Sequence, residues 1–365
     1  MKVALFHTTL PQQGEKSGGV AMTVHRLANA LVRHESLDIT LFSCDPKPED
    51  ALYQHSHLFN GRLGTRLKRL TLLPLALNQV DFSGFDVLHL HGDDWFFVRR
   101  TLPTVRSLHG SALREAQSAT HLRRRLLQYI IYPLEHLSAR LATLTLGGGL
   151  DAARLYSARG MADNGVDTAL FAPRPKADYP LLAYVGGWDG RKRGAFAYRT
   201  FVERILPTFP DAKLYMACDR VPIHDGVIDG GVPDDRTLAD WLGKAWVFAY
   251  PSTYEGFGIP YIEAMASGTP IVTTRNSGAD YVLDRGRFGV LTDDSGFADA
   301  VIDLLRDRNQ REALAKAGFE RANLFTWPNV ARAHAEFYRR AIAEFRAPAT
   351  GDFGGARHSP PLRPE

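Results

Sequence analysis

The sequence predicts an α/β protein of two doubly wound domains, each with a parallel sheet covered by helices. Its 365 residues exceed what one hydrophobic core usually supports. Short apolar runs alternate with longer amphipathic stretches in two successive blocks, a pattern typical of parallel sheets covered by helices. Pro173, Pro175 and Pro180 indicate a linker between the blocks. We therefore expect an N-terminal domain over residues 1–172 and a C-terminal domain over residues 173–326.

The N-terminal block begins with an apolar run, a glycine loop and an amphipathic stretch. The same alternation then continues, which predicts strands at 3–6, 39–43, 87–91 and 105–109, and helices at 20–34 and 123–141. Proline cannot donate within a helix, so we expect Pro133 to interrupt the second helix.

The C-terminal block repeats the pattern. It predicts strands at 181–186, 213–217, 246–250 and 271–274, and helices at 196–206, 235–244, 297–305 and 311–322. A last helix is expected over 327–346, because apolar residues recur there at helical spacing. The tail over 347–365 is rich in Pro, Gly and Arg, which predicts disorder.

Composition excludes several functional classes. The chain is 45% hydrophobic and 23% charged, as ordinary soluble enzymes are. A net charge of +4 is too mild for a dedicated nucleic-acid binder. Cys44 and Cys218 are expected to stay reduced rather than to pair, and they offer no metal cluster. Residues 1–7 lack the features of a signal peptide, and no apolar stretch approaches about 20 residues, so we expect a cytoplasmic protein.

The segment 251–268 is the most informative part of the chain. Glu255 and Glu263 lie eight residues apart, as E-x7-E, and a Gly-Phe-Gly turn follows the first of them. Pro260 suits the start of a short helix, and Gly268 suits the position just past its end. Small turn residues and a helix N-terminus attract an anion such as a diphosphate. Carboxylates beside a phosphate need hydroxyl partners, so the pattern indicates a nucleotide sugar.

This segment resembles the signature of the retaining glycosyltransferases of family four, which have the GT-B fold. The resemblance covers nearly the whole chain, with further matches at Ser17–Val20, His89–His91, Leu108–Gly110, Asn164–Asp167, Gly186–Gly187, Arg191–Gly194 and Pro270–Val272. It implies two facing Rossmann-like domains, with the 327–346 helix crossing back to pack on the first.

The resemblance also implies roles on the donor side. Glu263 should bind the ribose hydroxyls, and Glu255 a hydroxyl of the donor sugar. The backbone amides around Phe257, Gly258 and Ile259 should orient the sugar and the phosphate.

The basic loop after the first strand of the C-terminal block departs from the family pattern of Gly-Arg followed by Lys-Gly. Trp188 occupies the place of the arginine, and Arg193 that of the lysine. Either Arg191 or Lys192 supplies the second cation, or one phosphate contact is absent. We expect Arg193 and one of these two to bind the diphosphate, since arginine suits bidentate phosphate binding.

Five residues of the N-terminal block complete the implied site. By resemblance, the Gly18-Gly19 loop approaches the donor phosphate and the acceptor, and His109 lies against the donor sugar. A simple turn and a structural histidine are the alternatives. His89 and His91 share one face by strand alternation and are structural or acceptor-side, with no further ligands for a metal.

The segment after residue 122 is basic and then apolar. Arg123, Arg124 and Arg125 precede the run Leu-Leu-Gln-Tyr-Ile-Ile-Tyr. This pattern fits a solvated face over a core helix, or a peripheral contact with a membrane surface.

Together these features predict a bacterial, metal-independent glycosyltransferase without a cofactor. It would move a sugar from a nucleoside diphosphate to a hydroxyl of a polysaccharide, glycolipid or natural product, by a front-face route that retains configuration. Two alternatives remain, a GT-B phosphorylase and a catalytically silent nucleotide-sugar-binding or scaffold protein. The chain is short for such a phosphorylase, and Trp188 supports the silent protein.

Overall fold

The computed structural model describes residues 1–12, 18–58, 66–119 and 121–347, which form two compact units. Unit 1 comprises Met1–Ala112, Tyr129–Asp163 and the described residues from Pro328 onward. Unit 2 comprises the described residues of Leu113–Gln128 together with Asn164–Trp327. The chain thus enters unit 2 first at Leu113 and again at Asn164, whereas one crossing at residue 173 was expected. Of the disordered tail expected over 347–365, residues 348–365 lie outside the described residues.

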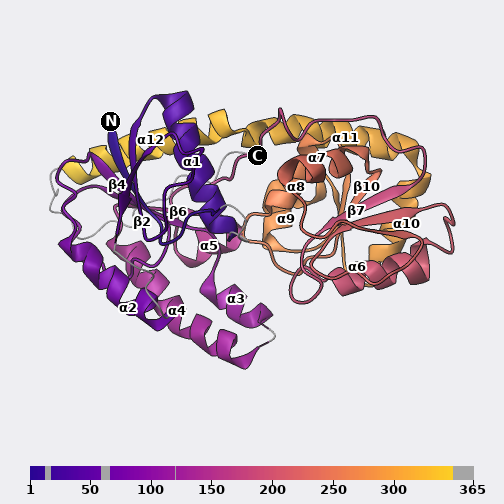
Figure 1. The fold of residues 1–365 in the computed structure, drawn as a ribbon, viewed down its shortest axis with the longest axis horizontal. Coiled ribbons are helices and arrows are strands. Elements are labelled where there is room, and N and C mark those ends of the chain that lie inside the picture. The colour runs from indigo at the N-terminus through magenta and orange to yellow at the C-terminus, as the bar shows by residue number, and fades with distance from the viewer. Residues whose placement is uncertain (13–17, 59–65, 120, 348–365) are drawn as a thin grey trace, which may run out of the picture. The chain divides into compact units, whose positions relative to one another are not determined.

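Unit 1 contains a six-stranded sheet in the order β3-β2-β1-β4-β5-β6, with all pairs parallel. In chain order, β2 and β3 are added on one side of β1 and β4 to β6 on the other, so a topological switch point lies between β1 and β4. Figure 1 labels β2, β4 and β6 of this sheet. The strands are β1 (Lys2–Phe6), β2 (Asp38–Ser43), β3 (Gln54–His57), β4 (Val87–Leu90), β5 (Thr104–Leu108) and β6 (Leu144–Gly147).

The helices in the first half of the chain are α1 (Gly19–Glu35), α2 (Arg66–Ala76), α3 (Ala112–Ser118), α4 (Leu122–Leu141) and α5 (Leu150–Leu155), with a 3-10 turn at Leu77–Gln79. The expected interruption at Pro133 was wrong, because α4 runs through it. Pro133 is exposed, so water can satisfy the carbonyl that its missing N–H leaves unbonded.

Unit 2 contains a second parallel sheet of six strands, in the order β12-β11-β10-β7-β8-β9. Its switch point lies between β7 and β10. The strands are β7 (Leu181–Val185), β8 (Lys213–Ala217), β9 (Val227–Asp229), β10 (Val247–Tyr250), β11 (Ile271–Thr274) and β12 (Val290–Thr292).

Besides α3 and the start of α4, unit 2 contains further helices, several of which pack against this sheet. They are α6 (Gly194–Thr200) continued by a π turn at Phe201–Ile205, α7 (Asp235–Lys244), α8 (Ile259–Ala266), α9 (Ser277–Val282), α10 (Phe297–Arg306) and α11 (Arg308–Ala322), with 3-10 turns at Asp284–Gly286 and Asn323–Phe325. Central strands such as β10 are buried along their whole length, which explains their unbroken apolar sequences.

The last helix, α12 (Trp327–Arg346), follows unit 2 in sequence but packs within unit 1. Tyr338 Oη lies 2.9 Å from His89 Nδ1 of β4. Glu344 forms an ion pair with Arg159, and the ring of Phe337 lies against Gly160. The deepest residues of α12 are Val330, Ala331, His334, Ala335, Tyr338 and Ala341.

Candidate functional site

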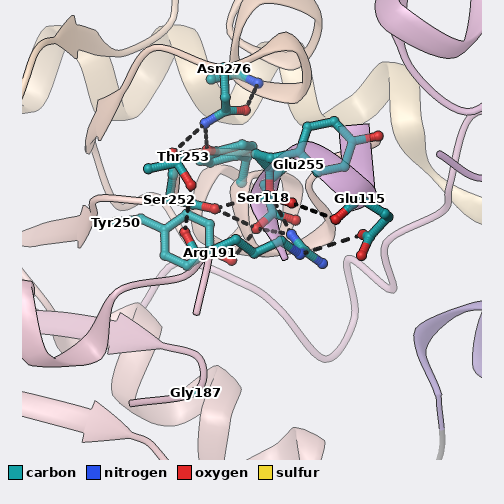
Figure 2. Close-up of polar contacts among 12 residues, drawn as sticks. Glu115, Ser118, Gly187, Arg191, Tyr250, Ser252, Thr253, Glu255 and Asn276 are labelled. Carbon is teal, nitrogen blue, oxygen red and sulfur yellow. Dashed lines mark hydrogen bonds and ion pairs between the residues drawn. The ribbon is translucent and has the colours of Figure 1, made fainter. Parts of the chain in front are cut away.

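Two loops of unit 2 meet at its switch point, one after β7 and the other after β10. These strands are neighbours in the sheet, so their carboxyl ends bring the loops together. Thr253 N donates to Arg191 O at 2.9 Å, and Thr253 Oγ1 reaches the same oxygen at 3.3 Å. The two loops are therefore joined at Arg191 (Figure 2).

Glu255 is the buried acid of this site, with 5% of its surface exposed. Its Oε1 accepts hydrogen bonds from Tyr250 Oη at 2.7 Å and from Ser252 Oγ at 2.8 Å. Arg191 Nη1 lies 2.8 Å from the same oxygen. In the part of the chain that the structure describes, no donor reaches Oε2, so this oxygen can accept a hydrogen bond from a ligand.

The side chain of Arg191 is held by several acceptors. Figure 2 shows it between Glu255 and Glu115, whose Oε1 lies 3.8 Å from Arg191 Nε. Arg191 Nη1 also donates to Tyr254 O at 2.5 Å. Burial alone would lower the pKa of this guanidinium, but the attraction of Glu255 outweighs it and the pKa is raised. Arg191 is thus a fixed positive charge beside a fixed carboxylate.

A buried polar network holds the β10 loop in place. Asn276 caps α9 by accepting from Ala279 N at 2.9 Å, and its Nδ2 donates to Ser252 O and to Tyr261 Oη, both at 2.9 Å. Gly278 lies so close that a Cβ there would come within 2.7 Å of Phe257 O. The loop that carries Glu255 therefore has little freedom to move.

The helix α8 begins at the expected turn. Gly258 has a φ of +97° and Tyr261 packs against its Cα, so only glycine fits. Among the described residues, no side chain caps the start of the helix, and no acid lies in its first turn. Glu263 follows one turn later and is 7% exposed. Both carboxylates of the E-x7-E pair are thus buried, on either side of a helix N-terminus that favours an anion.

The three basic residues after β7 take different directions. Arg193 donates to both carboxylate oxygens of Asp294, at 2.6 and 2.7 Å, and lies over the ring of Phe196. Lys192 Nζ lies 5.8 Å from the ring centre of Tyr250. The structure therefore brings Arg191, and not Arg193, to Glu255.

Trp188 occupies the place where the resemblance expects an arginine. Its backbone N donates to Asp219 Oδ1 at 2.8 Å. Arg220 lies over its ring, 5.3 Å from the centre. The departure from the family pattern thus puts an aromatic ring under a second arginine.

Histidines gather in unit 1 where β4 and β5 end. His91 Nδ1 lies 2.9 Å from His109 Nε2, and the rings of His89 and His91 are 3.9 Å apart. Burial lowers the pKa of His109 to about 3, with neighbouring His7 and Arg106 adding to the shift, and the pKa values of His89 and His91 also fall well below the usual range. These rings are therefore neutral at pH 7.

His89 has a structural environment. Its Nε2 lies 2.8 Å from Ser107 Oγ and its Nδ1 2.9 Å from Tyr338 Oη, so both ring nitrogens are occupied. Of the two histidines expected to be structural or acceptor-side, His89 thus joins the core to α12.

Gly18 and Gly19 form the start of α1 in unit 1. Gly18 has an ordinary extended backbone, with φ −69° and ψ 146°. A Cβ on either glycine would meet no described atom within 4 Å. Their lack of a side chain is therefore not required by the described residues around them.

Several residues of the unit 2 site could not be found from the sequence. Tyr250 and Glu115 contact Glu255 or Arg191, yet neither belongs to a recognisable motif. Ser252 also contacts Glu255 and lies in the 251–268 segment, but nothing in the sequence singles it out there. Asn276 does follow a known signal, an Asn-Ser-Gly sequence after a strand, which is typical of a helix N-cap.

Two protein families match the chain, in the order of its units. "Glycosyltransferase Family 4" matches residues 17–146, and "Glycosyl transferases group 1" matches residues 227–321. The chain is a glycosyltransferase of the family-four type. Solved structures show its fold to be GT-B. Sucrose-phosphate synthase from Thermosynechococcus elongatus matches with a TM-score of 0.76 and 22% identity, over 94% of this chain and 99% of the other. Anabaena HepE in complex with UDP and glucose follows with a TM-score of 0.69 and 16% identity, over 93% of this chain and 100% of the other.

Curated relatives of this glycosyltransferase include two D-inositol 3-phosphate glycosyltransferases. That of Nocardioides sp. (strain ATCC BAA-499 / JS614) is 39% identical over 30% of this chain and 24% of its own length. That of Paenarthrobacter aurescens (strain TC1) is 37% identical over 30% of this chain and 28% of its own. The match thus spans about a quarter of each. Phosphatidyl-myo-inositol mannosyltransferase from Mycolicibacterium smegmatis is 28% identical over 67% of this chain and 68% of its own length.

The described residues offer neither a metal site nor a helix that could span a membrane. They contain no group of three or more His, Cys, Asp or Glu side chains placed to hold a metal ion. None of the described helices is both long and apolar enough to cross a bilayer.

Proposed function

We propose that this glycosyltransferase moves a sugar from a nucleoside diphosphate to an acceptor hydroxyl with retention of configuration. The observation that carries the proposal is the meeting of Glu255, Arg191 and the α8 N-terminus at the switch point of unit 2. One rigid carboxylate, one permanent cation and an uncapped helix start suit a ligand that carries both hydroxyls and phosphate.

On the donor side, each group has a proposed partner. Glu255 Oε2 accepts a hydrogen bond from a hydroxyl of the sugar, because Oε1 already has three donors. Glu263 binds the ribose hydroxyls. The amides around Phe257, Gly258 and Ile259 orient the sugar and the phosphate.

Charge on the leaving diphosphate is stabilised by cations and by the helix dipole. Arg191 is the first of these cations, with Lys192 beside it, because both lie near the carboxylate site. Arg193 would reach a phosphate only if its ion pair with Asp294 broke. We propose that these groups stabilise the charge that develops on the diphosphate without a metal or an added cofactor.

The chemistry we propose is a front-face substitution. The bond from the anomeric carbon to the phosphate oxygen breaks as the acceptor oxygen bonds to the same face of that carbon. The departing phosphate takes the acceptor's proton. By the family resemblance, we propose that His109, whose ring contacts His91, and the Gly18-Gly19 loop assist the reaction, while His89 stays structural.

The names of the curated relatives suggest which acceptors to test first. Two relatives are named for D-inositol 3-phosphate and one for phosphatidyl-myo-inositol. We propose an inositol-type or similar polyol hydroxyl as the acceptor.

The test begins with binding and ends with turnover. Nucleoside diphosphates and their sugars are screened by thermal shift, where a ligand at about 100 times its Kd adds about 2.7 kcal/mol of stability. Each binder is then incubated with inositol acceptors, and release of the nucleoside diphosphate is measured. Binding without release on any acceptor would favour the silent protein, and a requirement for inorganic phosphate would favour the phosphorylase.

A further inference from the structure

Helix α4 presents a continuous apolar stripe to solvent. Leu122, Leu126, Tyr129, Ile130, Leu137 and Leu141 are between 37% and 63% exposed. At 100° per residue these positions fall within about one third of the helix circumference. The buried residues of the helix, Ile131, Ser138 and Ala139, lie on the opposite side. No described residue covers the stripe.

Positive charge borders this stripe on both sides. The helical spacing puts Arg123 at one edge and Arg125 at the other, and both are exposed. Arg140 falls within the stripe near the end of the helix. The acid of α4, Glu135, faces inward, where it accepts from Ala112 N at 3.0 Å and from Tyr156 Oη. The outward side of the helix is therefore apolar and cationic, with no acid.

The chemistry of this face selects its partner. A water-facing helix does not normally keep large apolar side chains exposed along five turns, so something apolar is expected to cover them. Flanking arginines favour a surface that is apolar at depth and anionic at its rim. The interface of an anionic bilayer has this layering, and amphipathic helices with basic borders lie in it parallel to the surface.

We propose that α4 docks this protein on an anionic lipid surface, with its leucines and Ile130 inserted among the lipids and Arg123 and Arg125 at the headgroups. This interaction is separate from the donor site and does not depend on the proposed transfer reaction. The helix lies on the surface and does not span it.

The test is flotation of the full chain with vesicles of phosphatidylcholine, with and without phosphatidylglycerol. We expect binding to the anionic vesicles alone. Replacing Arg123 and Arg125 by Gln should weaken it about 25-fold, at about fivefold per arginine, and added salt should reduce this difference. The Leu126→Ser, Ile130→Ser double variant should lose at least about tenfold at all salt concentrations.

Three matched control variants test whether vesicle binding depends on α4 itself or on exposed charge and apolar surface in general. Arg306→Gln with Arg308→Gln removes two exposed charges from unit 2, and Ile223→Ser with Val232→Ser removes two exposed apolar residues there. Arg124→Gln removes a charge from α4 itself, but one that is paired with Glu115 at 2.8 Å. All three should bind vesicles nearly as the native chain does.

Three outcomes would overturn the proposal. One is no binding to anionic vesicles, and another is equal loss in the α4 variants and their controls. The third is self-association of the native chain without lipid that the Leu126→Ser, Ile130→Ser variant abolishes, since the stripe would then be a contact between copies. Thermal unfolding of each variant shows whether it is folded.

Discussion

At the level of single residues, the site depends on which arginine meets Glu255. The sequence predicted a cation in the loop after β7 but favoured Arg193 as its main member. The backbone explains the difference, because Arg193 has a φ of +63° and its side chain runs to Asp294, while Arg191 is held at Thr253 and Glu255. The spacing of a motif does not predict a left-handed backbone conformation at a residue other than glycine.

Replacing Arg191 should therefore harm catalysis more than replacing Arg193. For Arg191→Gln we expect kcat/KM to fall about 100-fold or more, because a preorganised charge on the leaving group is lost. Arg193→Gln, a matched loss of one charge two residues away, should cost much less. Steady-state kinetics of both variants decide the point, and the reverse order would show that the loop aligns as the family pattern suggested.

Glu263 offers a second test at this scale. Glu263→Gln keeps the shape of the side chain but removes a charged acceptor, which is worth about 1.5–3 kcal/mol for one hydrogen bond. Affinity for the nucleoside diphosphate should fall about 10- to 100-fold in isothermal titration. Glu312→Gln, an exposed site on α11, serves as the control. Equal affinity in the native chain and in Glu263→Gln would remove Glu263 from the donor site.

At the level of elements, the sequence predicted what strong apolar periodicity specifies. Most central strands and long helices lie within a few residues of the expected ranges, and α7 runs over the expected residues 235–244. The strands β3, β6, β9 and β12 were missed because they are three or four residues long and lie at the sheet edges. Helix α9 was missed because Gly278 weakens its helical signal.

The turn before α8 gives a prediction for that element. Gly258→Ala puts a Cβ on a residue with φ +97°, where its ideal position is 2.3 Å from the ring of Tyr261. We expect loss of at least about 2 kcal/mol of unfolding free energy, from backbone strain and overpacking. Chemical denaturation measures this change. Gly231→Ala, at φ +54° with no atom within 4 Å, carries a similar backbone cost without the clash and should lose less.

At the level of the whole molecule, buried histidines predict how stability depends on pH. Burial lowers the pKa of His334 to about 4 and that of His109 to about 3, from an ordinary value of 6.5. Between about pH 4 and pH 6.5 the unfolded chain therefore binds protons that the folded chain does not. Stability is full above this window and falls as the pH drops through it, by about 1.4 kcal/mol per pH unit for each such histidine.

The measurement is the unfolding free energy in urea at a series of pH values. We expect it to fall steadily as the pH drops below about 6, with a shallower fall in His334→Gln, which has one fewer group to protonate. His34→Gln is the control, since His34 lies in the last turn of α1 and is not part of the buried cluster. A flat profile down to pH 4 would show that these histidines are not buried in their neutral form.

The central claim, retaining transfer from a nucleotide sugar, is tested most directly by NMR of the reaction product. The native chain is incubated in EDTA with the nucleotide sugar that it binds best and with an inositol acceptor. The anomeric couplings of the glycoside product are recorded and compared with those of the donor. The claim predicts a new glycosidic signal of the same anomeric configuration as the donor, formed at a rate that EDTA does not change. A product of inverted configuration, or transfer that stops in EDTA and returns with magnesium or manganese, would contradict it.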